Sequence, residues 1–476
     1  MLRHAYKVIS HLSPTLGQIV EGAYYTFNGW RFDDLKRHVD TSLRQGSGGA
    51  SFTLAMTFAD LMGQQESAME PKRLAFVTNF PPEDTGIATC SFYSWLGYDG
   101  AVDIFCPVAD PDSFMTNRML LRRSGDMRLL DVEAFATACQ INRYHHIVIV
   151  IGNSDHCAYV QKILKKAVTF GDVEKCTLYV HDACLLNLIQ RGGDISSRQM
   201  VRALETIYGQ PLAHTAPPGA RDWEVHGELV ARDILGPRWF RSLGFRKFLV
   251  NSDAARELLE ADLIGTDSVV QTVFHPAFLP MGAETVLEAS PPIPQAQDRV
   301  ALTVGTFGIP SSAKRTEDIA GAVQSLRRGG RDTRLVVAGF GVNDYVERHA
   351  RLLDGVDLQV FDGPTDVEFV QAMSHVDVAV QLRKENLGES SGVVPQLLQL
   401  GKPVVVNAIG SFTEFGEAVT AVSAAATTEE IAHAITRAAD DPPREQAIRR
   451  YVNDHRPSRF REALFEALES MPAEPR

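Results

Sequence analysis

Short apolar runs alternate with helix-spaced segments along most of the chain. The runs that predict strands lie at residues 74–78, 102–105, 146–151, 176–180, 248–252 and 269–274, then at 300–305, 335–339, 356–361, 376–380, 403–406 and 419–422. Helical apolar spacing predicts helices from residue 87 onward and at 162–170, 254–261, 317–328, 393–400, 428–439 and 459–468. Because strands and helices alternate, the pattern predicts an α/β fold with parallel sheets and right-handed crossovers.

The length of the chain favours two such units. With 476 residues, the chain exceeds what a single hydrophobic core usually fills. We expect an N-terminal extension at 1–72, mainly helical and of unknown role, followed by a Rossmann-like domain at 73–285. A proline-bearing linker at 286–298 then leads to a second Rossmann-like domain at 299–455, and 456–476 forms a C-terminal helix and tail.

Residues 190–245 interrupt the strand pattern of the first domain. They are rich in Gly, Pro, Arg and His, and residues 214–219 are predicted to be a loop. An excursion of this kind often covers an active site or an acceptor channel, which is the role expected here.

Composition restricts the classes of partner. A formal net charge of −12 disfavours a nucleic-acid partner, because proteins bind such partners largely through phosphate contacts. Residues 1–16 lack the apolar core of a signal peptide, and no run of about 18 apolar residues predicts a membrane span. We therefore expect a cytoplasmic protein.

The distribution of the cysteines also indicates a cytoplasmic protein. None of the six belongs to a C-x-x-C pair, and they are scattered through the first half of the chain at Cys90, Cys106, Cys139, Cys157, Cys176 and Cys184. This distribution is typical of reduced thiols in a cytosolic protein and predicts no structural metal site.

The stretch from Gln381 to Val406 carries the most chemistry. It runs from the end of an apolar strand through a Gly-Glu-Ser-Ser-Gly turn at 388–392 into a helix, and Gly401 is placed to cap that helix before the next strand. This layout aims backbone N–H groups and the positive end of a helix at an anion. Arg383 and Glu389 place charged side chains beside the turn.

Polar side chains also follow the strands of the first domain. A loop with two prolines and Gly86 lies between the first strand and the next helix. Asn153 and His156 follow one buried strand, and His181 with Asp182 follows the next. Ligands of open α/β sheets bind at the carboxyl ends of the strands, so these side chains are predicted to face one cleft.

The turn at 388–392, followed by Leu400-Gly401-Lys402-Pro403-Val404-Val405, resembles the donor-site signature of family 4 glycosyltransferases of the GT-B fold. The loop Pro81-Pro82-Glu83-Asp84-Thr85-Gly86-Ile87-Ala88 is similar to a P-P-x-x-S-G-I-A element of bacterial members, with Thr85 in the serine position. The Gly152-Asn153-Ser154 segment and the strand that ends in His181-Asp182 extend the resemblance. It implies two Rossmann-like domains whose parallel sheets face each other across a cleft.

The resemblance also implies roles for single residues. Glu389 matches a glutamate that binds the donor sugar or phosphate, and His181 matches a histidine that hydrogen-bonds the transferred sugar; these two are the expected catalytic residues. Lys314, at a loop-to-helix junction, matches a phosphate-binding lysine, and Arg383 could supply a second positive charge. The remaining expected donor-binding residues are Gly86, Gly388, Ser390, Ser391, Gly392, Gln396 and Glu414. Asn153, His156 and Asp182 are expected in the acceptor or sugar cleft.

Two features depart from the family pattern. Gln396 stands where a second glutamate holds the nucleotide ribose, which keeps hydrogen bonding but loses the charge. An arginine expected a few residues before Lys314 is missing, and residues 305–308 occupy that region.

The residues and the resemblance together indicate a metal-independent glycosyltransferase that moves a sugar from a nucleotide-sugar donor to an acceptor hydroxyl on a glycan, a lipid-linked molecule or a protein. The resemblance further implies that the anomeric configuration is retained. No cofactor is expected. Peripheral membrane association and a homo-oligomer stay open, as do two other functions: a GT-B nucleotide-sugar epimerase, or a degenerate GT-B scaffold without catalysis. The Asp110-Pro111-Asp112 triplet has the D-x-D form of a metal-binding transferase motif, but such acidic triplets are common by chance.

Overall fold

The computed structural model describes Thr53, Met56, Thr57, Asp60, Leu61 and residues 73–122, 126–141, 144–217, 219–283 and 301–471. The linker predicted at 286–298 and almost all of the extension predicted at 1–72 lie outside the described residues.

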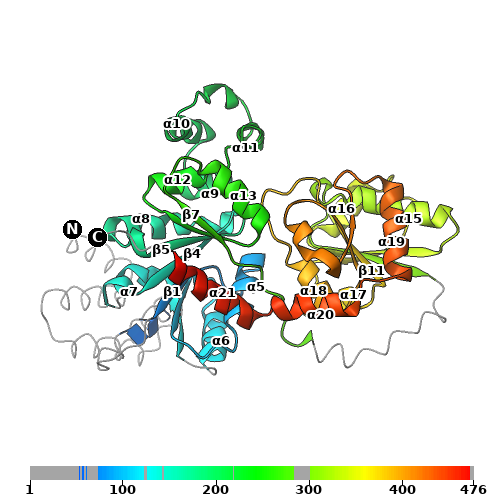
Figure 1. Ribbon diagram of the computed structural model, residues 1–476, viewed down its shortest axis with the longest axis horizontal. Helices are drawn as coiled ribbons and strands as arrows, with labels where there is room; N and C mark the ends of the chain where they lie inside the picture. The colour runs from blue at the N-terminus through cyan, green and yellow to red at the C-terminus, as the bar shows by residue number, and fades with distance from the viewer. Residues whose placement is uncertain are drawn as a thin grey trace, which may run out of the picture.

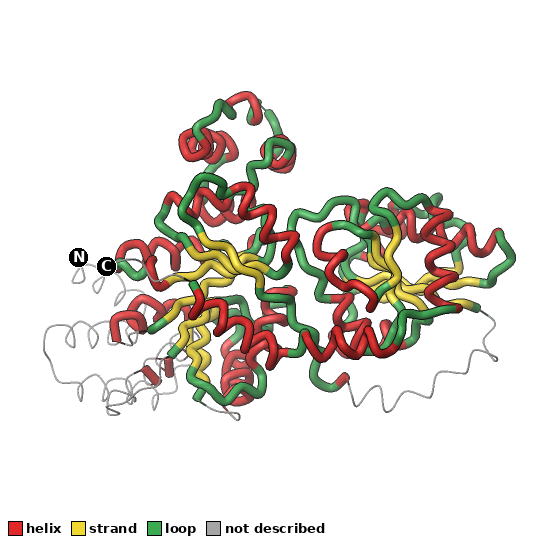
Figure 2. Tube along the Cα trace, viewed as in Figure 1, coloured by secondary structure: helices red, strands yellow, loops and turns green. Residues whose placement is uncertain are grey.

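The first domain is built on a seven-stranded parallel sheet (Figures 1 and 2). Its order is β3-β2-β1-β4-β5-β6-β7. The strands are β1 (Leu74–Val77), β2 (Val102–Cys106), β3 (Met127–Asp131), β4 (His146–Ile151), β5 (Cys176–Val180), β6 (Lys247–Val250) and β7 (Val269–Thr272). The order reverses between β1 and β4, and the carboxyl edge beside such a reversal is where open α/β sheets bind ligands.

Helices cover both faces of this sheet. They are α5 (Gly86–Trp95), α6 (Pro111–Arg122), α7 (Phe135–Ile141), α8 (Val160–Phe170), α9 (Leu186–Gly193), α10 (Ser197–Tyr208), α11 (Asp222–Val230), α12 (Pro237–Ser242) and α13 (Asp253–Asp262). Short 3-10 turns lie at Val132–Ala134, Asp155–Cys157, Val173–Lys175 and Ala213–Thr215. Alternate residues of β1 enter different cores: Ala75 and Val77 pack on one side, Leu74 and Phe76 on the other. A strand buried on both faces explains the continuous apolar runs of the sequence.

The second domain repeats the plan with a six-stranded parallel sheet of order β10-β9-β8-β11-β12-β13. Its strands are β8 (Leu302–Phe307), β9 (Thr333–Gly339), β10 (Asp357–Asp362), β11 (Val378–Gln381), β12 (Val404–Asn407) and β13 (Thr420–Val422). Its helices are α15 (Thr316–Arg328), α16 (Val342–Arg348), α17 (Asp366–Ser374), α18 (Val393–Gln399) and α19 (Thr428–Asp440), with 3-10 turns η6 (Ser312–Lys314) and η7 (Gly410–Ala418).

The end of the described chain returns to the first domain. Helix α20 (Glu445–Asp454) packs against α18 and η7, and α21 (Pro457–Ser470) packs against α5 (Figure 1). Phe460 and Leu464 of α21 join the core that contains Trp95. This crossing helix couples the two domains, because its burial needs the first domain although it follows the second in sequence.

The predicted fold class is confirmed: two Rossmann-like domains with parallel sheets face each other. The strand β3 and the helix α20 were not anticipated. The excursion at 190–245 folds mainly as helices, of which α10 and α11 project from the body of the first domain (Figure 1).

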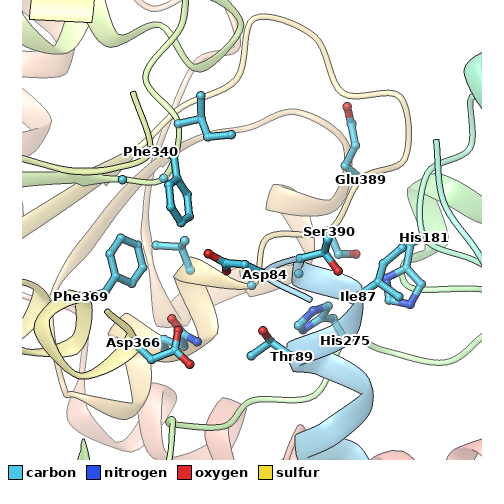
Figure 3. Close-up of a pocket in the computed structure, with 18 of the residues that line it drawn as sticks. Asp84, Ile87, Thr89, His181, His275, Phe340, Asp366, Phe369, Glu389 and Ser390 are labelled. Carbon is cyan, nitrogen blue, oxygen red and sulfur yellow. The ribbon is translucent and has the colours of Figure 1, made fainter. Parts of the chain in front are cut away.

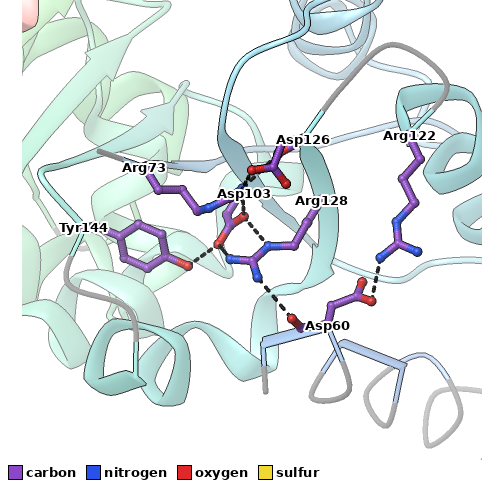
Figure 4. Close-up of polar contacts among 7 residues, drawn as sticks. All are labelled: Asp60, Arg73, Asp103, Arg122, Asp126, Arg128 and Tyr144. Atoms are coloured by element: carbon purple, nitrogen blue, oxygen red, sulfur yellow. Dashed lines mark hydrogen bonds and ion pairs between the residues drawn. The ribbon is translucent and has the colours of Figure 1, made fainter. Parts of the chain in front are cut away.

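A buried ionic cluster lies at the amino edge of the first sheet, opposite the carboxyl ends of its strands (Figure 4). Asp103, with no exposed side-chain surface, pairs with Arg73 and Arg128 and accepts from the Tyr144 hydroxyl. Asp60 pairs with Arg122, and its carbonyl oxygen accepts from Arg128 at 3.1 Å. The cluster therefore connects Asp60, which precedes the sheet in sequence, to strand β3 and helix α6.

Candidate active site

A cavity of about 500 Å³ opens between the two domains (Figure 3). The residues that line it come from the carboxyl ends of strands in both sheets, as expected for ligand sites in this kind of sheet. Eight of the predicted site residues line it: Gly86, His181, Asp182, Lys314, Glu389, Ser390, Gly392 and Gln396. Folding thus gathers residues that are up to 310 positions apart, from Gly86 to Gln396.

The loop after β1 forms one wall. Thr85 caps α5 by accepting the Ala88 N–H at 3.1 Å, which fixes Gly86 as the first helical residue at the cavity. A Cβ added to Gly86 would meet no atom within 4 Å. The space beside this backbone is therefore open for a ligand to approach closely.

Asp182 is held by the loop after β4. Its Oδ2 accepts the backbone N–H of Asn153 at 2.7 Å. Burial, with a smaller contribution from Glu389, raises the pKa of Asp182 to about 6. The Asp182 carboxylate of the first domain and the Glu389 carboxylate of the second therefore line the same cavity and interact electrostatically.

Lys314 provides the positive charge on the opposite wall. The turn that carries it is closed by Ser311, whose hydroxyl accepts the Lys314 N–H at 3.3 Å. The ammonium lies against Gly308, a residue at φ +96° that also lines the cavity. Burial, reinforced by Arg383, lowers the pKa of Lys314 to about 7.

Arg383 lies behind the cavity wall rather than in it. Its backbone is clamped by Asn407, which accepts from the Arg383 N–H at 2.8 Å and donates to the Arg383 carbonyl at 2.7 Å. Its guanidinium lies 5.3 Å from the centre of the Phe412 ring. Burial lowers the pKa of Arg383 and Glu389 opposes that shift, so Arg383 interacts with the charge of Glu389 as well as with that of Lys314.

The Gly-Glu-Ser-Ser-Gly turn touches the first domain. Gly388 adopts φ +90°, and a Cβ there would lie 2.7 Å from the Cβ of Ala183 and 3.1 Å from that of Ala255. The Leu387 carbonyl accepts the Ala183 N–H at 3.0 Å, while the Leu387 N–H donates to Glu389 Oε2 at 2.8 Å. The turn therefore fixes the Glu389 carboxylate and the contact between the domains at once.

The two serines of the turn have different surroundings. Ser391 is buried, and its hydroxyl accepts the Val394 N–H at 3.2 Å in the first turn of α18. The Ser390 hydroxyl is also buried, but it has no hydrogen-bond partner in the part of the chain that the structure describes, and Ser390 lines the cavity. A buried polar atom without a partner is costly, so the Ser390 hydroxyl is available to a ligand group in the cavity.

Besides Arg383, Gly388 and Ser391, three more predicted residues do not line this cavity. Asn153 uses its side-chain oxygen to accept the Asn187 N–H at 2.8 Å at the start of α9. His156 is exposed in the 3-10 turn after β4 and does not line this cavity, whereas His181 does. Glu414 lines a separate cavity of about 30 Å³ and accepts the Ala254 N–H at 3.1 Å, at the start of α13.

The excursion at 190–245 was expected to cover an active site or an acceptor channel. None of its described residues lines the cavity. The lining residues that the sequence did not suggest include Asp84, Asn251, His275, Phe340, Asp366 and Phe369. Asn251 and His275 follow β6 and β7, so the strand-end pattern that identified His181 could have found them.

Phe340 and Phe369 face the end of the cavity opposite His181 and His275 (Figure 3). Asp366, the first residue of α17, lies near them, and burial together with Asp84 raises its pKa. The cavity thus has an aromatic end and a histidine end.

No group of metal-ligating side chains large enough to hold a metal ion occurs among the described residues. Asp110 of the D-x-D triplet instead caps α6 by accepting the Ser113 N–H at 2.8 Å. None of the described helices is long and apolar enough to cross a membrane.

The solved structures with a similar fold include a protein bound to UDP-glucose and two sugar-phosphate synthases. HepE from Anabaena, in complex with UDP-glucose, is 15% identical with a TM-score of 0.52, covering 84% of this chain and all of HepE. The UDP-forming α,α-trehalose-phosphate synthase from Burkholderia vietnamiensis is 13% identical with a TM-score of 0.52, covering 84% of this chain and 99% of that one. Sucrose-phosphate synthase from Thermosynechococcus elongatus is 13% identical with a TM-score of 0.51, over 84% of this chain and 100% of that one.

These similarities establish the GT-B fold. Neither the protein-family models nor the curated protein sequences gave a match.

Proposed function

We propose that this protein is a glycosyltransferase that binds a nucleotide-sugar donor in the interdomain cavity and transfers the sugar to an acceptor hydroxyl. The observation that carries the proposal is the position of Lys314. It is the only Lys or Arg among the described residues that line the cavity, and it sits beside Arg383 and opposite the first domain. A diphosphate leaving group needs stabilisation of this kind as the glycosidic bond breaks.

The other groups of the cavity fit the rest of such a donor. Ser390 offers an unpartnered hydroxyl, Glu389 and Asp182 offer carboxylates that can accept from sugar hydroxyls, and Gln396 offers an amide. Phe340 and Phe369 provide an aromatic surface suited to a planar base. HepE, which shares the fold, binds UDP-glucose, and this supports a sugar nucleotide as the ligand here.

The finer points of the proposal concern the chemistry of transfer. We expect a hexosyl donor and retention of the anomeric configuration. We also expect activity without a divalent metal, because Lys314 lines the cavity as a cation for the phosphates and the buried Arg383 lies close to it. The acceptor is a glycan, a lipid-linked molecule or a protein, and the reaction is expected in the cytoplasm.

A thermal-shift screen of UDP, GDP, ADP and dTDP sugars tests the proposal. A donor that binds the folded protein raises its apparent melting temperature. Lys314→Ala and Glu389→Ala should abolish the shift. Lys384→Ala is the matched control. Lys384 lies in the same chain segment as Glu389, but its side chain is exposed and does not line the cavity. If no sugar nucleotide stabilises the wild type, or if Lys384→Ala weakens binding as much as Lys314→Ala, the proposed site is wrong.

Turnover of the selected donor is then measured with EDTA present. Release of the nucleoside diphosphate that depends on Glu389 and continues in EDTA would support a metal-independent transferase. A wild type that binds the donor but never turns it over would favour a non-catalytic scaffold. The coupling constant of the anomeric proton in the product, measured by NMR, decides between retention and inversion.

A further inference from the structure

Two histidine rings face one end of the cavity (Figure 3). His181 follows β5 and His275 follows β7, so they come from different strand ends of the first sheet. Their Nε2 atoms have no hydrogen-bond partner in the described part of the chain, whereas each Nδ1 has one. The partner of Nδ1 determines which nitrogen of each neutral ring carries the proton.

For His181 the partner is Asn251. The Tyr179 hydroxyl, which is fully buried, contacts the Asn251 side-chain oxygen, and the Asn251 amide nitrogen lies 3.1 Å from His181 Nδ1. Asn251 is the only partner of the Tyr179 hydroxyl among the described residues, so this hydroxyl must donate to avoid an unpaired buried donor. Asn251 then accepts from Tyr179 and donates to Nδ1. His181 must therefore carry its proton on Nε2.

For His275 the partner is its own neighbour. Nδ1 lies 3.0 Å from the carbonyl oxygen of Pro276, a group that can only accept. The proton is therefore on Nδ1, and Nε2 carries a lone pair. A Cβ on Gly392 would lie 3.9 Å from this Nε2, so it points towards the start of α18 and the cavity.

Both rings are neutral over the physiological pH range. Burial, and then repulsion from His275, lowers the pKa of His181 to about 3. Burial, opposed by Pro276, lowers the pKa of His275 to about 4. The two rings therefore present one hydrogen-bond donor and one acceptor without adding a net charge.

We propose that His181 and His275 form a donor–acceptor pair that recognises a hydroxyl of a polyhydroxylated ligand, with Asn251 and Tyr179 as the positioning residues of His181. A hydroxyl both donates and accepts, so it satisfies the two Nε2 atoms together. A phosphate oxygen would face the lone pair of His275, and an ammonium would face the N–H of His181. The pair thus assigns this end of the cavity to sugar and the Lys314 wall to phosphate. This assignment to sugar rests on the proposed function.

The tautomers can be measured without any ligand. In protein labelled with ¹⁵N-histidine, long-range proton–nitrogen NMR spectra should show an Nε2–H ring for His181 and an Nδ1–H ring for His275, both neutral from pH 5 to 8. His181→Ala and His275→Ala assign the signals. His156→Ala is the control, since it removes an exposed ring and should change neither tautomer. A positively charged ring with protons on both nitrogens, or the same neutral tautomer at both positions, would overturn the proposal.

Asn251→Asp tests the positioning residue. A carboxylate at 251 can only accept, so it should keep the Tyr179 contact and draw a proton onto His181 Nδ1. A His181 ring whose Nδ1 stays unprotonated in this variant would show that Asn251 does not set the tautomer. If the variant does not fold, the wild-type spectrum alone decides whether the tautomers are as proposed.

Ligand titrations separate this inference from the proposed function. The nucleotide sugar selected by the thermal-shift screen should move both Nε2 signals, and the matching nucleoside diphosphate should move neither. His275→Asn, which keeps a donor for Pro276 but removes Nε2, should weaken the nucleotide sugar about tenfold and leave the diphosphate unaffected. Equal shifts with the diphosphate alone would overturn the assignment to sugar. A protein with the expected tautomers that binds no sugar nucleotide would instead overturn the proposed function.

Discussion

The backbone N–H of Ala183 donates to the carbonyl oxygen of Leu387 across a distance of 3.0 Å, and this hydrogen bond joins the two domains beside the cavity. The bond is possible because the next residue, Gly388, has no side chain and adopts φ +90°. The contact holds the turn that carries Glu389, so domain docking and the geometry of the site depend on the same few atoms.

Gly388→Ala should therefore separate the domains at this point. The new methyl group would enter the space of Ala183 and Ala255, and the left-handed backbone adds strain of about 1 kcal/mol. We expect a lower melting temperature and loss of nucleotide-sugar binding in thermal-shift and calorimetric titrations. Gly401→Ala is the control: it has φ +67° but no atom within 4 Å of its Cβ, so it should cost strain while binding persists. Equal loss of binding in both variants would contradict the role of the close contact.

The affinity for a nucleotide sugar should fall as the pH rises above 7. The pKa of Lys314 is lowered to about 7, mainly by burial, so the free protein loses the ammonium charge above this pH. A bound diphosphate favours the charged form, and binding then requires uptake of a proton. The dissociation constant from calorimetry should rise above pH 7 by at most about tenfold per pH unit.

Lys314→Arg is the matched control for this pH dependence, because an arginine stays charged throughout the range. Its dissociation constant should not change between pH 7 and 9. If Lys314→Arg follows the same slope as the wild type, then another group is responsible for the pH dependence.

Ser390→Ala and Ser391→Ala should have opposite effects. Ser390 buries a hydroxyl without a partner, so its removal should leave the free energy of unfolding unchanged or raise it by up to about 1 kcal/mol. The same change should weaken the donor, because the ligand group that completes the hydroxyl loses its partner. Ser391 caps the first turn of α18, so its loss should cost about 0.5–2 kcal/mol of stability. Urea denaturation and donor titration of both variants check this; a stability loss confined to Ser390→Ala would contradict it.

Asp103→Ala should strongly destabilise the first domain. The substitution leaves Arg73 and Arg128 buried without their shared partner, which typically costs about 3–5 kcal/mol. Removing the exposed pair of Glu445 and Arg449 by alanine should change the melting temperature little. The measurement is thermal unfolding by circular dichroism; an Asp103→Ala variant as stable as the wild type would mean that the cluster is not needed for folding.

Several parts of the site were accessible from sequence because they are local. The turn at 388–392, the proline-bearing loop before Gly86 and the strand end at His181 each depend on residues close together in the chain, whose spacing fixes their backbone conformation. The alternation of apolar strands and amphipathic helices was likewise sufficient to predict two parallel sheets.

Other parts depended on packing between distant segments. His156 and His181 both follow strands, yet the 3-10 turn after β4 leaves His156 exposed, and His275 lies in the cavity instead. Glu414 was expected to bind the donor, but its carboxylate accepts a backbone N–H at the start of α13 in the other domain.

The sequence by itself determined the two-domain α/β architecture and the position of the glycine-rich turn, because periodicity and turn residues act over a few positions. Only the tertiary structure decided which charged and polar side chains meet: Lys314 beside Arg383, Gly388 against Ala183, and Asn251 against His181. The reason is physical. Burial and electrostatic interaction depend on distance in space, and that distance is set when the two domains and the returning helix α21 pack together.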